Sequence, residues 1–261
     1  DSEDIVNLYK DNIILNSIVR GLGRSYGDSS LDYNVISLKN YEKFNKLDDN
    51  LGTLECSSNY SLNEILKLIV KKGWFFNVTP GSKFITIGGA IASDVHGKNH
   101  HLDGSFCDYI FSFKIITSQG ILYNCSKGEN SELFHATCGG MGLTGIIISA
   151  KIKLLKIKSK IIKKKIIKTK NLEETIKSFK KFNENKYLVA WIDALAKNES
   201  MGRSIIFIGN HSDEGDLSFL EKIKFSIPRI FPGFLLNKFV IKLFNKFYYF
   251  FHKNNKESKI N

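Results

Sequence analysis

The side chains best suited to chemistry lie in one short polar stretch, His96-Gly-Lys-Asn-His-His101. Imidazole and ammonium groups donate hydrogen bonds, and imidazole exchanges protons near neutral pH. A cation or N–H donor beside a reacting group also stabilises negative charge that develops there. The stretch therefore carries groups of the kind that catalytic sites use.

A metal cluster is the alternative interpretation of the same stretch, because Asp94, Asp103 and Cys107 lie nearby in the sequence. His96 and His100 would share one face of a helix only if the helix ran through the intervening glycine, and no second ligand cluster occurs elsewhere. We therefore expect no metal. The four cysteines have no C-x-x-C spacing and are expected to be buried free thiols. A serine hydrolase is not indicated, because the G-x-S-x-G motif is absent.

Three glycine-rich segments are the second chemical feature of the sequence: Arg20–Asp28, Pro80–Ser93 and Gly139–Gly145. Segments of this kind present backbone N–H groups and let the main chain approach a ligand closely. Several of them together suit a large phosphate-containing cofactor that lies extended across a domain. The third segment also matches G-x-G-x-x-G over Gly140–Gly145. A helix is expected before it and a strand after it, which is the reverse of the dinucleotide-binding order, so a tight turn beside a ligand is favoured.

The surrounding pattern predicts the elements that position these segments. An apolar, β-branched run at 13–19 predicts a strand that feeds the first loop, and Ser61-x-x-Glu64 predicts the start of a helix over 61–72. Other expected strands and helices are listed here by range: strands at 35–38, 52–56, 145–157, 187–194 and 204–209, a hairpin of 111–117 with 121–124, helices at 131–137 and 171–182, and a helix that begins near 88. The residue pattern at Leu154-Leu155 predicts a β-bulge.

The charge distribution argues against the nucleic-acid partner that a net charge of +12 first suggests. Residues 1–150 carry 13 basic and 16 acidic side chains, whereas 151–170 carry 10 lysines and no acid. We expect that lysine run to be the solvated face of a strand pair. Residues 235–247 have apolar side chains at helical spacing beside three lysines, which predicts an amphipathic helix. Two interpretations of it stay open: a peripheral membrane contact through 234–251, and a helix that packs its apolar face in a core.

The combination of motifs resembles the FAD-binding domain of the vanillyl-alcohol-oxidase (PCMH) type of flavoprotein. The resemblance rests on Arg20-Gly-Leu-Gly-Arg-Ser-Tyr-Gly-Asp28, Thr86-Ile-Gly-Gly-Ala-Ile-Ala92, the histidine stretch and Gly139-Gly-Met-Gly-Leu-Thr-Gly145. It implies an α+β fold, with a two-subdomain PCMH-type FAD-binding domain in residues 1–155. An incomplete α+β substrate domain in residues 156–261 follows, because the chain covers only a little over half of such a protein.

The resemblance implies that His96 and Lys98 reach the isoalloxazine and substrate side, which makes them the candidate catalytic residues. It also implies residues that hold FAD: Arg20, Gly21, Gly23, Arg24, Ser25, Tyr26, Gly81, Ser82, Gly88, Gly89, Ala92, Ser93, Gly97, Gly142, Gly145 and Ile147. Sugar-lactone oxidases of the superfamily often carry a flavin-linked histidine where Arg24 stands, so non-covalent FAD is expected.

The implied activity is oxidation of a secondary alcohol on a polyprenyl-phosphoryl pentose. A hydride would pass from the ribose 2′ carbon to flavin N5. The implied role is in the synthesis of an arabinose donor for the cell wall or other glycans. Expected partners are the lipid-linked sugar phosphate and the reductase of a two-component epimerase, with no nucleic acid. A sugar-lactone or alditol oxidase, or a non-catalytic FAD-binding fragment, stays an alternative. The sequence assigns no compartment, and a cytoplasmic-membrane-associated or periplasmic protein would fit.

Overall fold

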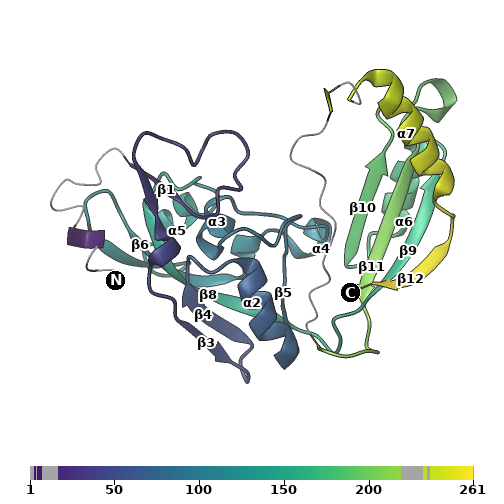
Figure 1. The fold of residues 1–261 in the computed structure, drawn as a ribbon. Helices are drawn as coiled ribbons and strands as arrows, with labels where there is room; N and C mark the ends of the chain where they lie inside the picture. Colours follow the sequence, from purple (N-terminus) through teal and green to yellow (C-terminus); the bar gives the residue numbers. More distant parts are fainter. Residues whose placement is uncertain (1–2, 4, 8–16, 219–231, 234–235, 261) are drawn as a thin grey trace. The chain divides into compact units, whose positions relative to one another are not determined.

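The computed structural model of this protein describes residues 3, 5–7, 17–218, 232–233 and 236–260 (Figure 1). The chain divides into two compact units, unit 1 over Asp1–Ile157 and unit 2 over Lys158–Asn261. Mixed helix and strand in both units confirms the expected α+β class. The division follows residue 157, whereas the sequence placed it after residue 155.

Unit 1 is built on a six-stranded antiparallel sheet of order β3-β4-β8-β6-β7, in which β5 also pairs with β8. The strands are β3 (Asn45–Asp48), β4 (Thr53–Ser57), β5 (Trp74–Phe76), β6 (Ile110–Ile116), β7 (Leu122–Ser126) and β8 (Ile146–Lys156). β8 is the central strand and runs as the sequence predicted. The expected hairpin is confirmed as β6 and β7.

The bulge predicted at Leu154-Leu155 is wrong. β8 pairs with β4 up to Lys153 and with β5 from Leu154 onward, and the register is regular across this point. The change in the apolar pattern at Leu154-Leu155 therefore marks the point at which β8 stops pairing with β4 and begins to pair with β5. The irregularities lie instead in the pairing of β6 with β8, where the register shifts twice.

A small parallel pair, β1 (Ile18–Arg20) with β2 (Val35–Ser37), packs on one face of the sheet. Apolar side chains of both strands join a buried cluster with the sheet residues Ile116, Ile146 and Ile148. A 3-10 turn, Leu38–Asn40, continues this layer. Only the end of the predicted strand at 13–19 can be compared, because residues 8–16 lie outside the described residues.

The remaining elements of unit 1 are short helices with recognisable caps. They are α2 (Leu62–Ile69) with a 3-10 turn (Val70–Lys72), α3 (Ile87–Ala92), α4 (His100–Asp103), a 3-10 turn (Phe106–Tyr109) and α5 (Ser131–Thr137). The predicted capping box is confirmed, because the Ser61 side chain accepts from the Glu64 N–H and the Glu64 carboxylate accepts from the Ser61 N–H. Gly73 ends the last turn at φ 77°.

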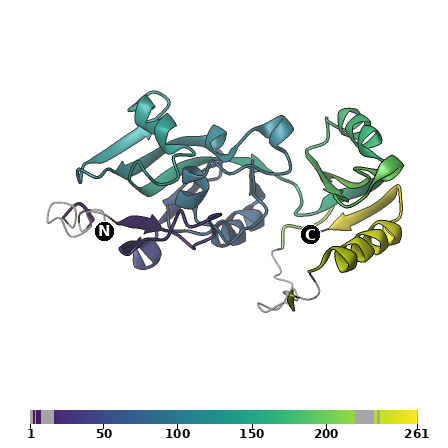
Figure 2. The same ribbon diagram turned by 90° about the horizontal axis from the view of Figure 1, so that it is seen from above.

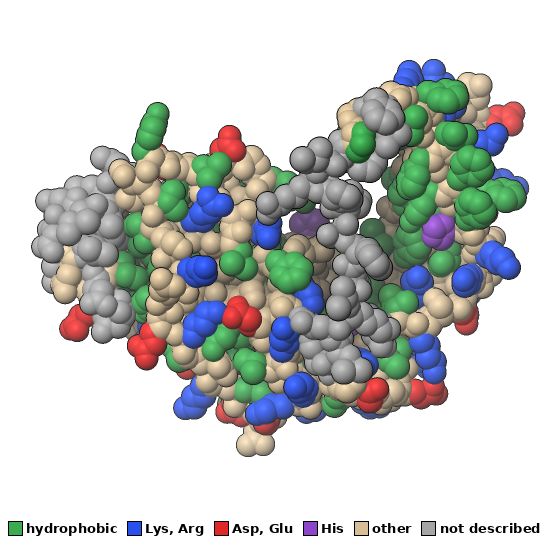
Figure 3. All heavy atoms as spheres, in the orientation of Figure 1, with side chains coloured by type: hydrophobic (Ala, Val, Ile, Leu, Met, Phe, Trp, Pro, Cys, Tyr) green, Lys and Arg blue, Asp and Glu red, His purple; other side chains and the backbone are tan. Residues whose placement is uncertain are grey.

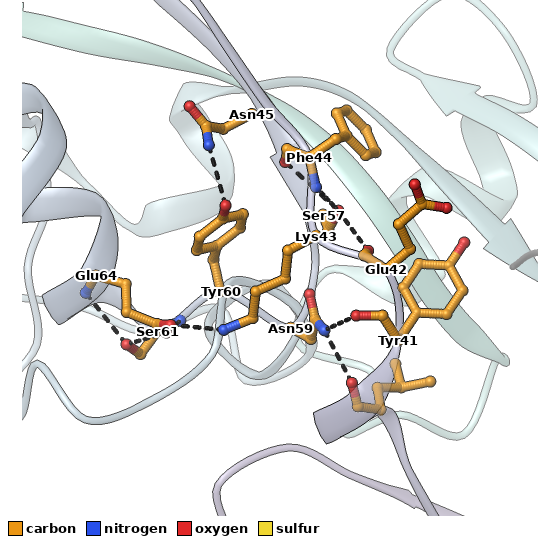
Figure 4. Close-up of polar contacts among 11 residues, drawn as sticks. Tyr41, Glu42, Lys43, Phe44, Asn45, Ser57, Asn59, Tyr60, Ser61 and Glu64 are labelled. Carbon is orange, nitrogen blue, oxygen red and sulfur yellow. Dashed lines mark hydrogen bonds and ion pairs between the residues drawn. The ribbon is translucent and has the colours of Figure 1, made fainter.

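Side-chain hydrogen bonds tie the segment after β2 to the start of α2 (Figure 4). The Asn59 amide donates to the carbonyls of Leu38 and Tyr41, both at 2.9 Å. Ser57 Oγ accepts from the Phe44 N–H at 2.9 Å. Because β2 pairs with β1, these bonds also fix the position from which the first glycine-rich loop leaves the fold.

Unit 2 is a four-stranded antiparallel sheet between two helices (Figure 2). The strands, in sheet order, are β10 (Tyr187–Ile192), β11 (Ser204–His211), β9 (Ile162–Thr169) and β12 (Lys256–Ile260), and the helices are α6 (Leu172–Lys181) and α7 (Lys238–Phe251). Phe179 of α6 packs with Ile206 and Ile208. The ring of His252, just after α7, contacts Phe207 on the opposite face of β11.

The lysine-rich run is not the face of one strand pair, as the sequence suggested. Three of its lysines lie on β8 of unit 1 and four on β9 of unit 2, which belong to different sheets. Ion pairs anchor several lysines of the run: Lys160, between the two strands, lies 2.9 Å from Asp216, and Lys165 lies 3.5 Å from Glu257 of β12. Figure 3 shows lysine and arginine side chains spread over both units.

The predicted amphipathic helix is confirmed as α7, which begins after Asn237. The expected contact segment starts at 234, but 234–235 lie outside the described residues. No helix in the described part of the chain is long and apolar enough to cross a membrane.

Candidate functional site

The first glycine-rich loop leaves β1 and lies against the start of α3. A Cβ atom added to Gly21 would lie 2.5 Å from Thr86 Oγ1, so the close approach of the loop backbone to the Thr86 side chain requires glycine there. Gly23 has φ 60°, and a Cβ atom added to it would meet the Arg20 guanidinium. The Arg24 side chain is exposed on the same loop. Two arginine side chains, Arg20 and Arg24, therefore belong to the first glycine-rich loop.

Thr86 places the second loop as well as contacting the first. It is the N-cap of α3, and its Oγ1 accepts from the Gly89 N–H at 3.1 Å. Gly88 donates to the Ser58 carbonyl at 2.9 Å, and an added Cβ there would lie 3.2 Å from Ser58 Cβ. The glycines at the start of α3 therefore let it pack closely beside the chain that leaves β4.

The third loop is bonded to the other end of α3. Gly139 donates to the Ile91 carbonyl at 3.1 Å, and Met141 donates to the Ala92 carbonyl at 2.7 Å. Met141 and Gly142 both have left-handed φ angles, 54° and 82°. As expected for a tight turn, α5 precedes this G-x-G-x-x-G segment and β8 follows it. Contacts with α3, a helix of six residues, therefore hold all three loops.

The histidine stretch packs against the residues that lead into the second loop. A Cβ on Gly97 would lie 2.6 Å from the Thr79 carbonyl oxygen. The buried Asn99 amide donates to the Asn77 carbonyl at 2.7 Å and to the Asp103 carboxylate. His96 and Lys98 remain exposed on either side of Gly97. Both candidate catalytic side chains are therefore held on an ordered segment and face solvent.

The loop backbones fit the pyrophosphate of FAD. Among the described residues, none accepts a hydrogen bond from the backbone N–H groups of Gly21 to Gly27. A Cβ added to Gly27, Gly81 or Gly142 would meet no atom within 4 Å, so these turns border open space. Unpaired N–H groups beside arginine side chains are the donor set that binds an anion.

The structure does not bring all of the predicted site residues together. Ser25, Tyr26 and Ser82 are exposed on the first and second loops, and Ser93 caps the end of α3. By contrast, Ile147 is 6% exposed within β8. Gly145 comes just before that strand, where an added Cβ would lie 2.3 Å from the Ile116 carbonyl oxygen. These two residues are packed in or against the sheet. A direct contact of either one with FAD stays a prediction.

Three residues position the site although the sequence did not predict that role for them: Thr86, Asn99 and Asp94, of which Asp94 was considered only as a metal ligand. Asp94 has φ 38°, and its carboxylate accepts from the Ser105 hydroxyl and the Cys107 N–H, both at 2.9 Å. The T-x-x-G spacing before α3 could have indicated the cap at Thr86. Asn99 and Asp94 act through contacts between distant segments, which no local pattern indicates. Among the described residues, no group of three or more His, Cys, Asp or Glu side chains has the arrangement of a metal site.

Comparison with known proteins agrees with this geometry. The sequence profile of a family described as "FAD binding domain" matches residues 3–126. Decaprenylphosphoryl-beta-D-ribose oxidase of Mycolicibacterium smegmatis is 35% identical over 246 residues, which are 89% of this chain and 54% of that protein. The chain therefore spans about half the length of that relative.

Shorter matches to other proteins lie within a third or so of the chain. Human Delta(24)-sterol reductase is 25% identical over 95 residues, or 36% of this chain and 18% of that protein. Cytokinin dehydrogenase 5 of Arabidopsis thaliana is 33% identical over 72 residues, or 27% of this chain and 13% of that protein. At 246 residues, the likeness to the ribose oxidase is long enough to extend into both units.

Proposed function

Given that residues 3–126 form an FAD-binding domain of the PCMH type, we propose that this protein is an FAD-dependent oxidoreductase acting on a secondary alcohol. The glycine-rich loops gathered on α3 carry the proposal, because among the described residues the N–H groups of Gly21 to Gly27 have no acceptor and the exposed Arg24 lies on the same loop. When bound, FAD supplies an isoalloxazine ring that accepts a hydride at N5.

The residues of the chain divide the remaining tasks among them. The N–H groups of Gly21 to Gly27 and the Arg24 guanidinium bind the pyrophosphate oxygens. His96 accepts the proton of the substrate hydroxyl as its carbon gives up the hydride, so that the alcohol becomes a ketone. Lys98 provides a positive charge that stabilises the electron pair received from the substrate. Because Arg24 forms no covalent bond to a flavin, the cofactor is held non-covalently.

The proposed substrate is a polyprenyl-phosphoryl pentose, oxidised at the 2′ hydroxyl of its ribose. The support is the 35% identity with the ribose oxidase over 89% of this chain. A keto sugar formed in this way would be consumed by a reductase that returns a hydride to the same carbon, which together gives an epimerisation. The proposed pathway role is the supply of an arabinose donor for glycans of the cell wall.

The surface of α7 fits a role beside a lipid-linked substrate. Its outward side chains include Phe239 and Phe250, which are 76% and 75% exposed. Lys238, Lys242 and Lys246 are also exposed, and α7 contains no acidic residue. Apolar side chains flanked by lysines suit the boundary between the headgroups and acyl chains of an anionic membrane. We therefore propose that α7 rests on such a membrane surface.

The test of the proposed activity is anaerobic reduction of the FAD-loaded protein by synthetic polyprenyl-phosphoryl ribose. We expect the flavin absorbance to bleach, and polyprenyl phosphate without a sugar should leave it unchanged. Bleaching by soluble alditols or aldoses alone would assign the substrate class of sugar or alditol oxidases instead. FAD binding without reduction by either class would leave a cofactor-binding module, and absence of FAD binding would overturn the proposal as a whole.

A further inference from the structure

Two of the four cysteines meet beside the third glycine-rich loop. Cys107 belongs to the 3-10 turn Phe106–Tyr109 and is buried, whereas Cys138 follows α5 directly and is only half-buried. Their thiols are hydrogen-bonded to each other. No local pattern pairs them, because 30 residues separate them along the chain.

The Cys107 thiol and the backbone next to Cys138 meet at the same carbonyl, that of Ile91. Cys107 Sγ lies 3.5 Å from the Ile91 oxygen, and the N–H of Gly139, next to Cys138, donates to that oxygen at 3.1 Å. The Cys107 N–H is fixed separately by the Asp94 carboxylate at 2.9 Å. Two thiols in contact on fixed backbones need little side-chain rotation to reach the separation of a disulfide.

The surroundings make the two thiols unequal. The hydrogen bond from Cys107, aided by the charge of Lys127, lowers the pKa of the Cys138 thiol against the opposing effects of burial and of Asp94. The same hydrogen bond and burial raise the pKa of Cys107. Cys138 is therefore the partly accessible nucleophile, and Cys107 is a protected thiol placed to react second.

We propose that Cys107 and Cys138 form a reversible disulfide when the protein meets a hydroperoxide. The Cys138 thiolate attacks one oxygen of hydrogen peroxide and becomes a sulfenic acid as the first water leaves. Cys107 then attacks that sulfur, the S–S bond forms, and the second water leaves. The two thiols together give up two electrons, which reduce one peroxide to two waters, and a dithiol reverses the change.

The disulfide would link the start of the third glycine-rich loop to the segment that follows the histidine stretch. Closing a loop of this length restricts the unfolded chain, so the oxidised protein should melt about 5 to 10 °C higher than the reduced protein. The cross-link forms within unit 1 and its formation depends on neither FAD nor substrate. Its failure and the failure of the proposed oxidoreductase activity are therefore separate results.

The experiment treats the purified full chain with hydrogen peroxide and maps its cysteines by peptide mass spectrometry after blocking free thiols. We expect two of the four thiols to disappear, a cross-linked peptide pair containing Cys107 and Cys138, and full recovery with dithiothreitol. Cys56→Ser and Cys125→Ser serve as matched controls that should form the same cross-link, whereas Cys138→Ser should not.

Three results would overturn the proposal, and each is readable on the unmodified chain. The first is irreversible oxidation or blocking of Cys138 while Cys107 stays a free thiol. The second is a disulfide that includes Cys56 or Cys125. The third is a Cys107 to Cys138 cross-link that appears only after the protein has been unfolded, which the melting curve of the treated sample would reveal.

Discussion

Gly21 and Thr86 form the contact through which the first glycine-rich loop is seated on α3. A Cβ atom on Gly21 would lie 2.5 Å from Thr86 Oγ1 and 3.1 Å from Thr86 Cγ2. Thr86 cannot turn away freely, because its Oγ1 caps α3 by accepting from the Gly89 N–H. The Thr86 hydroxyl thus caps the helix and also limits how closely the loop backbone can approach it.

Gly21→Ala should therefore weaken FAD binding without abolishing the fold. Overpacking of this kind costs about 1 to 3 kcal/mol, which corresponds to a loss of affinity of about tenfold or more if it displaces the loop. The measurement is an FAD titration followed by flavin fluorescence. Gly128→Ala is the matched control, because an added Cβ there meets no atom within 4 Å.

A second variant distinguishes steric displacement from a general loss of stability. Thr86→Ala removes the two atoms that the added carbon would meet, at a cost of about 1 kcal/mol for the lost cap. The double variant Gly21→Ala, Thr86→Ala should then recover part of the FAD affinity lost in Gly21→Ala. An additive loss in the double variant would mean that the close approach does not limit binding.

His96→Ala and Lys98→Ala should reduce turnover more than FAD content. Both side chains are exposed on a segment held by Asn99, so their removal leaves the packing of the loops intact. Loss of a proton acceptor or of a stabilising charge lowers the rate of flavin reduction by about 100-fold. Stopped-flow reduction at saturating substrate measures this rate, with Lys71→Ala as an exposed-lysine control. Purification of either variant as apoprotein would instead assign it a structural role.

Asp193 should make the stability of unit 2 depend on acid pH. Burial disfavours its charged form, but hydrogen bonds from the Arg203 guanidinium at 2.7 Å, the Asn245 amide at 2.7 Å and the Leu195 N–H at 3.1 Å outweigh it and lower the pKa below its usual value of 3.8. A depressed pKa in the folded state means that the stabilisation is complete above pH 3.8 and is lost as the pH falls through the lower folded value.

Asp193→Asn should remove this stabilisation at every pH above that window. Leaving the Arg203 charge without its partner costs about 3 kcal/mol. Urea unfolding followed by Trp191 fluorescence, in a Trp74→Phe background, reports on unit 2 alone. Asp213→Asn, which breaks an exposed pair with Lys158, should leave the midpoint unchanged. Equal midpoints for the wild-type chain and Asp193→Asn at neutral pH would contradict the assignment.

Replacing Lys238, Lys242 and Lys246 together by Gln should weaken association with anionic vesicles. Each lysine near such a surface contributes about 1 kcal/mol, so we expect a loss of about tenfold to 100-fold in a sedimentation assay with phosphatidylglycerol vesicles. FAD content should be unchanged. Replacing Lys177, Lys180 and Lys181 of α6 by Gln makes the same change in net charge on the other helix and is the control. If both triple variants lose the same affinity, bulk charge rather than α7 is responsible.

Local sequence patterns were sufficient to predict the elements that depend on residues close together in the chain. The capping box at Ser61 and Glu64, the helix expected over 171–182 and the β6–β7 hairpin are all confirmed. β3, β5 and β12 were missed, because N-K-L-D and K-E-S-K-I are polar edge sequences and W-F-F is too short to show a period.

The candidate site was predictable as three loops but not as one arrangement. Glycine content identified the loops, whereas their convergence depends on carbonyls at Ile91 and Ala92 and on a side-chain oxygen at Thr86. The contact of Cys107 with Cys138 is of the same kind. Such contacts are set by tertiary packing, so neither spacing nor propensity reveals them in a single sequence.

The attachment of all three loops to α3 restricts where the length of this chain can vary. A residue inserted or deleted within Thr86–Ala92 would turn the helix by about 100° and move both ends at once, so the three loops would lose register together. In the part of the chain that the structure describes, the main-chain hydrogen bonds of the turn between β6 and β7 lie within the turn, from the Thr117 N–H to Ile121 and from the Gly120 N–H to Thr117, so its length can change locally. Natural length variation should therefore gather in such turns and avoid α3.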